Sequence, residues 1–174
     1  MPLGIFPLLF VTTLTGVLTV GSPARLFTLP AINKEIANEL IHHEQVALGD
    51  FINPGARVPR QGVVLYFFDK SRGGDNLAIL NRIAKRNARQ QVQVIGIHSE
   101  SDNSDNMEAW ISELGLVFPV LTDKHSIVSM RYEIQGLPLA VIVDAEGQIV
   151  SIGNPTDTEL ESEINAALAT LVGD

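Results

Sequence analysis

Two uninterrupted apolar stretches stand out in the pattern of hydrophobic and polar positions along the chain. Residues 63–68 and 139–143 contain no polar group apart from the Tyr66 hydroxyl. Continuous apolar runs of this length are typical of strands that are covered on both faces of a sheet. The remaining predicted strands are shorter or less apolar: residues 27–30, 92–97, 118–121 and 148–152.

Helical periodicity separates these strands. Apolar side chains recur at intervals of three and four residues. This pattern predicts five helices: residues 33–45, 75–88, 105–115, 126–132 and 158–171. Asn33 is the predicted N-cap of the first helix, and Asp105 with Glu108 forms a capping-box pattern at the third. The order predicts an α/β fold: a central, mostly parallel sheet with an antiparallel edge hairpin, and helices on both faces.

The N-terminal segment, residues 1–20, is apolar and carries no charged side chain. Its length is close to the minimum of about 17 residues that spans a bilayer. Three interpretations remain open: a membrane anchor, a secretory signal, or a buried apolar element. A signal normally begins with a basic region, which is missing here. We therefore expect an apolar membrane anchor or signal segment at residues 1–20, followed by a folded domain at residues 21–174.

The composition of the chain excludes several classes of partner and of reaction. A net charge of −8 argues against a nucleic-acid partner, because phosphates are bound by clustered Lys and Arg. The chain has no cysteine, so it has no disulfide, no thiolate metal site and no cysteine nucleophile. A metal site needs three or four converging ligands, and the histidines do not suggest one. We predict no metal and no cofactor. The histidines are His42, His43, His98 and His125.

Five stretches follow one another in an order known from one group of proteins. They are residues 20–30, 46–51, 62–68 (Gly-Val-Val-Leu-Tyr-Phe-Phe), 114–123 (Leu-Gly-Leu-Val-Phe-Pro-Val-Leu-Thr-Asp) and 132–147. These stretches resemble the motifs of redoxins, the branch of the thioredoxin-like superfamily that includes TlpA/ResA-type disulfide reductases and AhpC/TSA peroxidases. The resemblance covers roughly residues 20–171 and implies a thioredoxin-like fold.

The resemblance implies a specific place for redox chemistry, and the chain departs from it there. In such proteins a Cys-x-x-Cys pair follows the first central strand and faces a cis-proline, here Pro138. Counting forward from the strand, the two cysteines fall on Arg72 and Asp75. Counting back from the helix, they fall on Lys70 and Gly73. We prefer the forward count, because sheet register fixes the end of a strand. Thiol–disulfide exchange needs a thiolate and is excluded in either case.

The remodelled junction has two interpretations. The N-terminus of a helix favours anions, so Arg72 and the backbone of Gly73 and Gly74 could hold a carboxylate or phosphate. Alternatively, the two glycines only form a tight turn and Asp75 caps the helix. In that case Arg72 points to solvent or pairs with Asp75.

We therefore predict a cysteine-free redoxin domain with no catalytic residue, which docks a protein partner through the former active-site face. Leu137 would offer its backbone to an extended peptide, unless cis-Pro138 only shapes the fold. The predicted protein-binding residues are Ser71, Arg72, Gly73, Gly74, Asp75, Leu137 and Pro138.

Two alternatives to this function stay open. One is a structural subunit of a membrane complex that is held by residues 1–20. The other is an enzyme with replaced chemistry at Arg72 and Asp75, although homology alone would suggest a thiol–disulfide oxidoreductase or peroxidase. We expect the protein to be membrane-associated or exported. The family resemblance favours the extracytoplasmic side, whereas Arg25 and Lys34 after the apolar segment would favour the cytoplasm.

Overall fold

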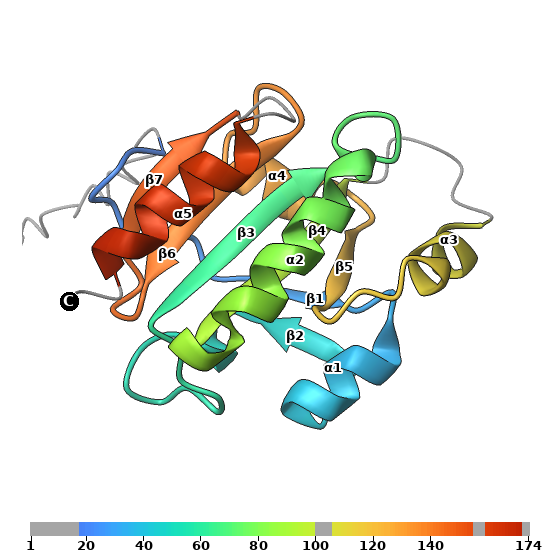
Figure 1. Cartoon of the computed structure of the whole chain (residues 1–174), viewed down its shortest axis with the longest axis horizontal. Helices are drawn as coiled ribbons and strands as arrows, with labels where there is room; N and C mark the ends of the chain where they lie inside the picture. Colours follow the sequence, from blue (N-terminus) through green and yellow to red (C-terminus); the bar gives the residue numbers. More distant parts are fainter. Residues whose placement is uncertain (1–17, 100–105, 155–158, 172–174) are drawn as a thin grey trace, which may run out of the picture.

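The computed structural model of the chain describes residues 18–99, 106–154 and 159–171. A five-stranded sheet forms the centre of the domain (Figure 1). In spatial order its strands are β5 (Val120–Asp123), β4 (Val92–Ser99), β3 (Gly62–Phe68), β6 (Leu139–Asp144) and β7 (Ile149–Gly153). Strands β3, β4 and β5 are parallel, whereas β6 runs antiparallel between β3 and β7. Four strands thus share one direction, and the predicted, mostly parallel sheet with its antiparallel hairpin is confirmed.

Helices cover both faces of the sheet, as the sequence predicts (Figure 1). One face packs against α2 (Leu77–Asn87), α3 (Met107–Glu113) and α5 (Leu160–Leu171). The other face packs against α1 (Lys34–Ile41) and α4 (Ile127–Arg131). Side chains of β3 alternate between the two cores, and all seven of its positions are buried. This double burial explains why the strand reads as an unbroken apolar run.

The first predicted helix is shorter than expected. It ends at Ile41, because His42 takes a left-handed conformation with φ +56°. Residues Gln45–Ala47 form strand β2, which pairs antiparallel with β1 (Thr28–Pro30). The predicted helix to residue 45 is therefore wrong at its end, where pairing with β1 outweighs the local helical pattern.

Asn33 does not cap α1 with its side chain, contrary to the prediction. Its Nδ2 instead donates to the Phe118 carbonyl oxygen at 2.9 Å, and its Oδ1 accepts from the Val120 N–H at 2.8 Å. Asn33 thereby ties the start of α1 to the beginning of the edge strand β5.

The second and third predicted helices also begin differently. A short 3₁₀ turn, η2 (Gly74–Asn76), precedes α2, and the exposed Asp75 makes no capping bond. The predicted cap at Asp75 is therefore wrong. The capping-box prediction at Asp105 lies outside the described residues, while α3 itself ends near Gly115 as expected.

The segment that enters the domain is tied to the β6–β7 hairpin. The N–H of Gly21 donates to the Ile149 carbonyl at 2.7 Å, and the N–H of Ile149 donates to the Ser22 carbonyl at 2.9 Å. Leu18 packs against the core of the α1 and α4 face. Within the described residues, no helix combines the length and apolarity needed to cross a membrane. Residues 1–17 of the predicted anchor or signal lie outside this range.

Candidate functional site

The loop after β3 and the segment before β6 meet at one end of the central strand. A Cβ atom placed on Gly73 would lie 2.6 Å from the Pro138 Cβ, so the glycine packs directly against the proline ring. Gly73 has φ +90°, a left-handed conformation that favours glycine. The Leu137–Pro138 peptide bond is cis. The structure thus brings together Gly73 and Pro138, which the sequence places 65 positions apart.

Two buried polar side chains fix the shape of this loop. The Tyr66 hydroxyl donates to the Gly73 carbonyl at 3.2 Å, and Asn76 Nδ2 donates to the Tyr66 oxygen at 2.9 Å. Both side chains are almost fully enclosed. Sequence reasoning did not single out either residue, because Tyr66 lies within an apolar run and Asn76 within a helical pattern.

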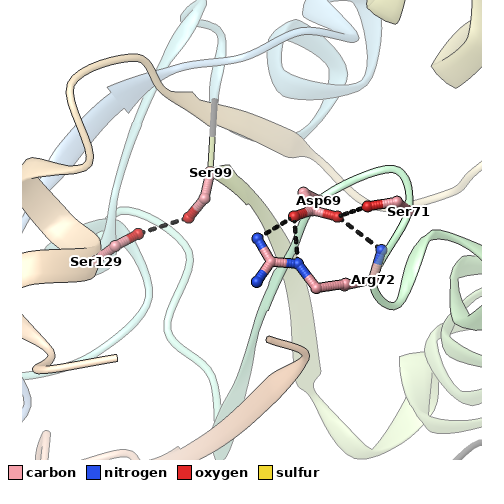
Figure 2. Close-up of polar contacts among 5 residues, drawn as sticks. All are labelled: Asp69, Ser71, Arg72, Ser99 and Ser129. Atoms are coloured by element: carbon pink, nitrogen blue, oxygen red, sulfur yellow. Dashed lines mark hydrogen bonds and ion pairs between the residues drawn. The ribbon is translucent and has the colours of Figure 1, made fainter. Parts of the chain in front are cut away.

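Asp69, the first residue after β3, is the centre of the loop (Figure 2). Its side chain is only 2% exposed. It accepts hydrogen bonds from the Ser71 hydroxyl at 2.8 Å, from the Arg72 N–H at 2.6 Å and from Arg72 Nε at 2.7 Å. Arg72 Nη2 completes an ion pair with the same carboxylate. Sequence reasoning missed Asp69, because a lone acid after a strand carries no signal of burial.

The electrostatics of Asp69 follow from these contacts. Burial by itself raises the pKa of the Asp69 carboxyl, but the hydrogen bonds from Arg72 and Ser71 together outweigh burial and hold the pKa below its usual value. Asp69 is therefore charged at neutral pH, and it balances the charge of Arg72. The predicted pairing of Arg72 with Asp75 is wrong: the Arg72 side chain is 53% exposed, and its guanidinium pairs with Asp69.

Trp110 closes the outer side of the loop. An added Cβ on Gly74 would lie 3.2 Å from the Trp110 ring, and the Lys70 ammonium lies 5.1 Å from the ring centroid. Trp110 is half-buried, so it belongs to the site as well as to the core on the α2, α3 and α5 face of the sheet. As the only tryptophan of the chain, it reports on this loop by fluorescence.

A hollow of about 610 Å³ opens beside Leu137 and Arg72. In Figure 2 the Arg72 guanidinium lies on the side of its loop that faces Ser99 and Ser129. Ser129 Oγ donates to Asp123 Oδ2 at 2.8 Å, so it must accept the 2.7 Å hydrogen bond from Ser99 Oγ. Within the described residues the Ser99 oxygen accepts no hydrogen bond, so it keeps acceptor capacity there for a ligand N–H. Met130, 65% exposed, adds an apolar rim.

The backbone along this hollow is open. Gln135, Gly136 and Leu137 line it, and their main-chain N–H and C=O groups have no hydrogen-bond partner within the described residues. Backbone groups are strong hydrogen-bonding groups that are normally paired when water is excluded. Three consecutive unpaired residues therefore offer a short edge to which a peptide can bond.

The described residues contain no assembled nucleophile. The Ser71 hydroxyl is bonded to the Asp69 carboxylate, and no histidine takes part in this bond. No group of three or more histidine, aspartate or glutamate side chains in the described ranges is placed to hold a metal ion. The arrangement is suited to binding, since its polar groups are either paired internally or main-chain groups open to a ligand.

The fold, together with the contact between the loop after β3 and the segment before β6, defines a protein of the thioredoxin-like class. A structure described as the thiol:disulfide interchange protein DsbE of Chlorobium tepidum is similar, with 18% identity and a TM-score of 0.72; the match covers 90% of this chain and 99% of that one. A secreted disulfide oxidoreductase of Mycobacterium tuberculosis gives 20% identity and a TM-score of 0.58, over 80% and 95% of the two chains. The reduced 2-Cys peroxiredoxin of Plasmodium vivax gives 16% and 0.63, over 87% and 81%.

Residues 20–152 match the sequence profile of the AhpC/TSA family. The chain belongs to the AhpC/TSA family. No curated protein is significantly similar to it in sequence. The solved structures share its fold at low identity, whereas this chain lacks the cysteine on which thiol chemistry depends.

Proposed function

We propose that this chain is a redoxin domain that binds an extended segment of a protein partner and does not carry out thiol–disulfide exchange. The binding surface, called the docking face below, consists of Ser71, Arg72, Gly73, Gly74, Asp75, Gln135, Gly136, Leu137 and Pro138. The observation that carries the proposal is the unpaired backbone of residues 135–137 beside the hollow.

Peptide capture on such an edge follows from ordinary hydrogen bonding. Each main-chain hydrogen bond adds about 0.5–1.5 kcal/mol net, and pockets for side chains supply the specificity. One partner side chain would enter the hollow, where it meets Met130, the Ser99 oxygen and the guanidinium edge of Arg72. The face combines apolar and polar groups, as expected for recognition of a peptide.

The rigidity of the loop supports binding as its role. Asp69, Tyr66 and Asn76 hold the loop through five hydrogen bonds: three to Asp69, one to the Gly73 carbonyl and one between the last two side chains. A surface that is already ordered loses little entropy when a partner binds. The loop is therefore held in one geometry by its own hydrogen bonds, without a thiol or disulfide.

Proposals for location and assembly rest on the apolar residues 1–20. We place the protein at a membrane or outside the cytoplasm, in line with the secreted disulfide oxidoreductase among its structural neighbours. If the protein is instead a structural subunit of a membrane complex, removing residues 1–20 would release it from that complex, while changes on the docking face would not.

The alternative of an enzyme with replaced chemistry at Arg72 and Asp75 has less support. Arg72 is bonded to Asp69, whereas Asp75 is exposed and forms no hydrogen bond or ion pair with Arg72 within the described ranges. The two side chains do not form a joint site for an anion.

The experiment selects extended peptides from a displayed library for binding to the folded domain. We expect the double variant Arg72→Ala/Leu137→Ala to bind the selected peptides at least tenfold more weakly. This loss corresponds to about 1.4 kcal/mol, the scale of one or two peptide contacts. The readout is Trp110 fluorescence or calorimetric titration.

The matched control is Lys85→Ala/Arg89→Ala, which changes two exposed residues outside the docking face. This control should bind the peptides as the wild type does. Peptides that bind the Arg72/Leu137 variant with unchanged affinity would refute the docking face.

A further inference from the structure

Helix α4 presents apolar side chains to solvent. Leu26, Ile127 and Met130 are between 46% and 65% exposed. Ile127 and Met130 lie three residues apart on the helix and therefore share one side of it. Leu26 joins them, because its carbonyl accepts a hydrogen bond from Arg131 Nη1 at 3.4 Å. Three of the five large apolar side chains that are exposed in the described residues thus gather at one place.

Basic side chains accompany these apolar ones. Lys124, His125 and Arg131 are exposed, and together with Ile127 they line a hollow of about 270 Å³ beside α4. Neither Lys124 nor Arg131 forms an ion pair with another described residue. The remaining walls of this hollow are mainly apolar. Two cations and a histidine therefore face solvent around an apolar depression.

The nearest acids do not pair with these cations. Asp123 lines the same hollow but is only 1% exposed. Its carboxylate accepts hydrogen bonds from the backbone N–H groups of Val128 at 3.2 Å and of Ser129 at 2.7 Å, inside the protein. Glu133 is half-buried and lines the hollow of the docking face instead. The positive charge beside α4 is thus open to a partner from outside the chain.

The combination of charges and apolar side chains defines the kind of partner. The chain as a whole carries a net charge of −8, so a negatively charged surface attracts it at this place and repels it elsewhere. Anionic membrane surfaces attract Lys and Arg, and exposed apolar side chains enter between their head groups. A small soluble anion would meet the cations but leave Leu26, Ile127 and Met130 in water.

The chain reaches α4 from its apolar N-terminal segment. Leu18 packs against the core of the same face of the sheet as α4. The hydroxyl of Tyr132, which follows α4, donates to the Arg25 carbonyl at 2.8 Å and fixes the entering chain beside the helix. Residues 21–25 alone separate the uncharged residues 1–20 from Leu26. Contact of residues 1–20 with a bilayer would therefore bring the α4 side of the domain close to it.

We propose that one surface of the domain, called the α4 surface below, lies against a bilayer that contains anionic lipid. The α4 surface consists of Leu26, Lys124, His125, Ile127, Met130 and Arg131. Lys124 and Arg131 meet the lipid head groups, while the three apolar side chains insert between them. This contact goes beyond the proposed peptide binding and does not depend on it.

The test places a fluorophore at single introduced cysteines of the full-length chain, which has no cysteine of its own. An environment-sensitive label on Ile127→Cys reports on the α4 surface. The same label on Ala78→Cys is the control, because Ala78 is exposed on α2, at the opposite face of the sheet. Vesicles of two parts phosphatidylcholine and one part phosphatidylserine should shift the label at residue 127 to shorter wavelength. A nitroxide on the lipid should quench it, whereas the label at residue 78 should show neither effect.

A pair of charge variants tests the two cations. In the labelled protein, Lys124→Gln/Arg131→Gln should raise the lipid concentration for half of the shift at least tenfold, which corresponds to about 1.4 kcal/mol. Lys85→Gln/Arg89→Gln removes the same charge from exposed positions away from α4 and should leave this concentration unchanged. Higher salt should weaken binding of the wild type, because it screens exposed charges.

Each failure has a distinct meaning. Protein that sediments with the vesicles while the label at residue 127 stays unchanged would refute the α4 surface and assign the membrane contact to residues 1–20. No binding to the vesicles would refute both the α4 surface and the proposed location at a membrane. An equal response to pure phosphatidylcholine, or an equal loss in the Lys85/Arg89 variant, would overturn the role of Lys124 and Arg131.

Discussion

Replacing Gly73 with alanine is expected to lower the free energy of unfolding by about 3 kcal/mol. A left-handed conformation costs a non-glycine residue about 1–3 kcal/mol, and overpacking adds about 1–3 kcal/mol. Both costs apply, because the new Cβ would lie 2.6 Å from the Pro138 Cβ and 2.6 Å from the Tyr66 hydroxyl oxygen at φ +90°. Urea unfolding followed by far-UV circular dichroism measures the change.

Gly21→Ala is the matched control for this prediction. Gly21 has nearly the same φ, +86°, but an added Cβ meets nothing within 4 Å. Gly21→Ala places alanine in a left-handed conformation without a steric clash, so its free energy of unfolding should fall by only about 1 kcal/mol. If the two variants were equally stable, Gly73 would not pack against Pro138 and the two halves of the docking face would not be in contact.

Replacing Asp69 with asparagine is expected to cost about 2–3 kcal/mol of unfolding free energy at pH 7, because hydrogen bonds to a charged group are worth about 1.5–3 kcal/mol. The variant loses the charge that Arg72 and Ser71 stabilise in the loop. Binding of selected peptides should weaken as well, since Arg72 loses the partner that positions its guanidinium. Urea unfolding and peptide titration are the two measurements.

The stability difference between the wild type and Asp69→Asn should depend on pH, in a direction that the pKa of Asp69 determines. The pKa of Asp69 is lower in the folded state than in the unfolded chain, so the carboxylate stabilises the fold fully above the unfolded value of about 3.9. That stabilisation is lost as the pH falls through the folded value. The difference between the wild type and Asp69→Asn should therefore shrink below about pH 4.

The control for the Asp69 variant is Asp75→Asn, which changes an exposed carboxylate of the same loop. The Asp75→Asn substitution should alter the unfolding free energy by less than about 0.5 kcal/mol, both at pH 7 and at pH 3. A difference between the wild type and Asp69→Asn that persists unchanged at pH 3 would show that charge pairing at Asp69 is not its cause.

The sequence predicts the central strands well because their environment is uniform. Strand β3 is buried on both faces, so each of its positions is apolar whichever core it faces. Sequence-based prediction fails where contacts with distant parts of the chain determine the local structure. Asparagine is a residue type that often caps helices, yet the Asn33 side chain bonds to the backbone of Phe118 and Val120. The helical pattern that begins at residue 33 extends to Gln45, yet Gln45 pairs with Pro30 of β1.

The candidate site divides in the same way. Glycine at residue 73 and proline at residue 138 are visible in the sequence because each has a special backbone conformation, and the structure places them in contact. Asp69 and Asn76 act through burial and through bonds that depend on the folded loop. Their roles leave no periodic or compositional trace, so they emerge only when the loop is seen folded.

The most direct measurement of the docking face is hydrogen–deuterium exchange with and without a selected peptide. The main-chain N–H groups of residues 135–137 have no partner in the described structure, so they should exchange rapidly in the free protein. Bound peptide should slow their exchange at least tenfold and leave residues 53–60 unchanged. Tight peptide binding with unaltered exchange at residues 135–137 would contradict the account.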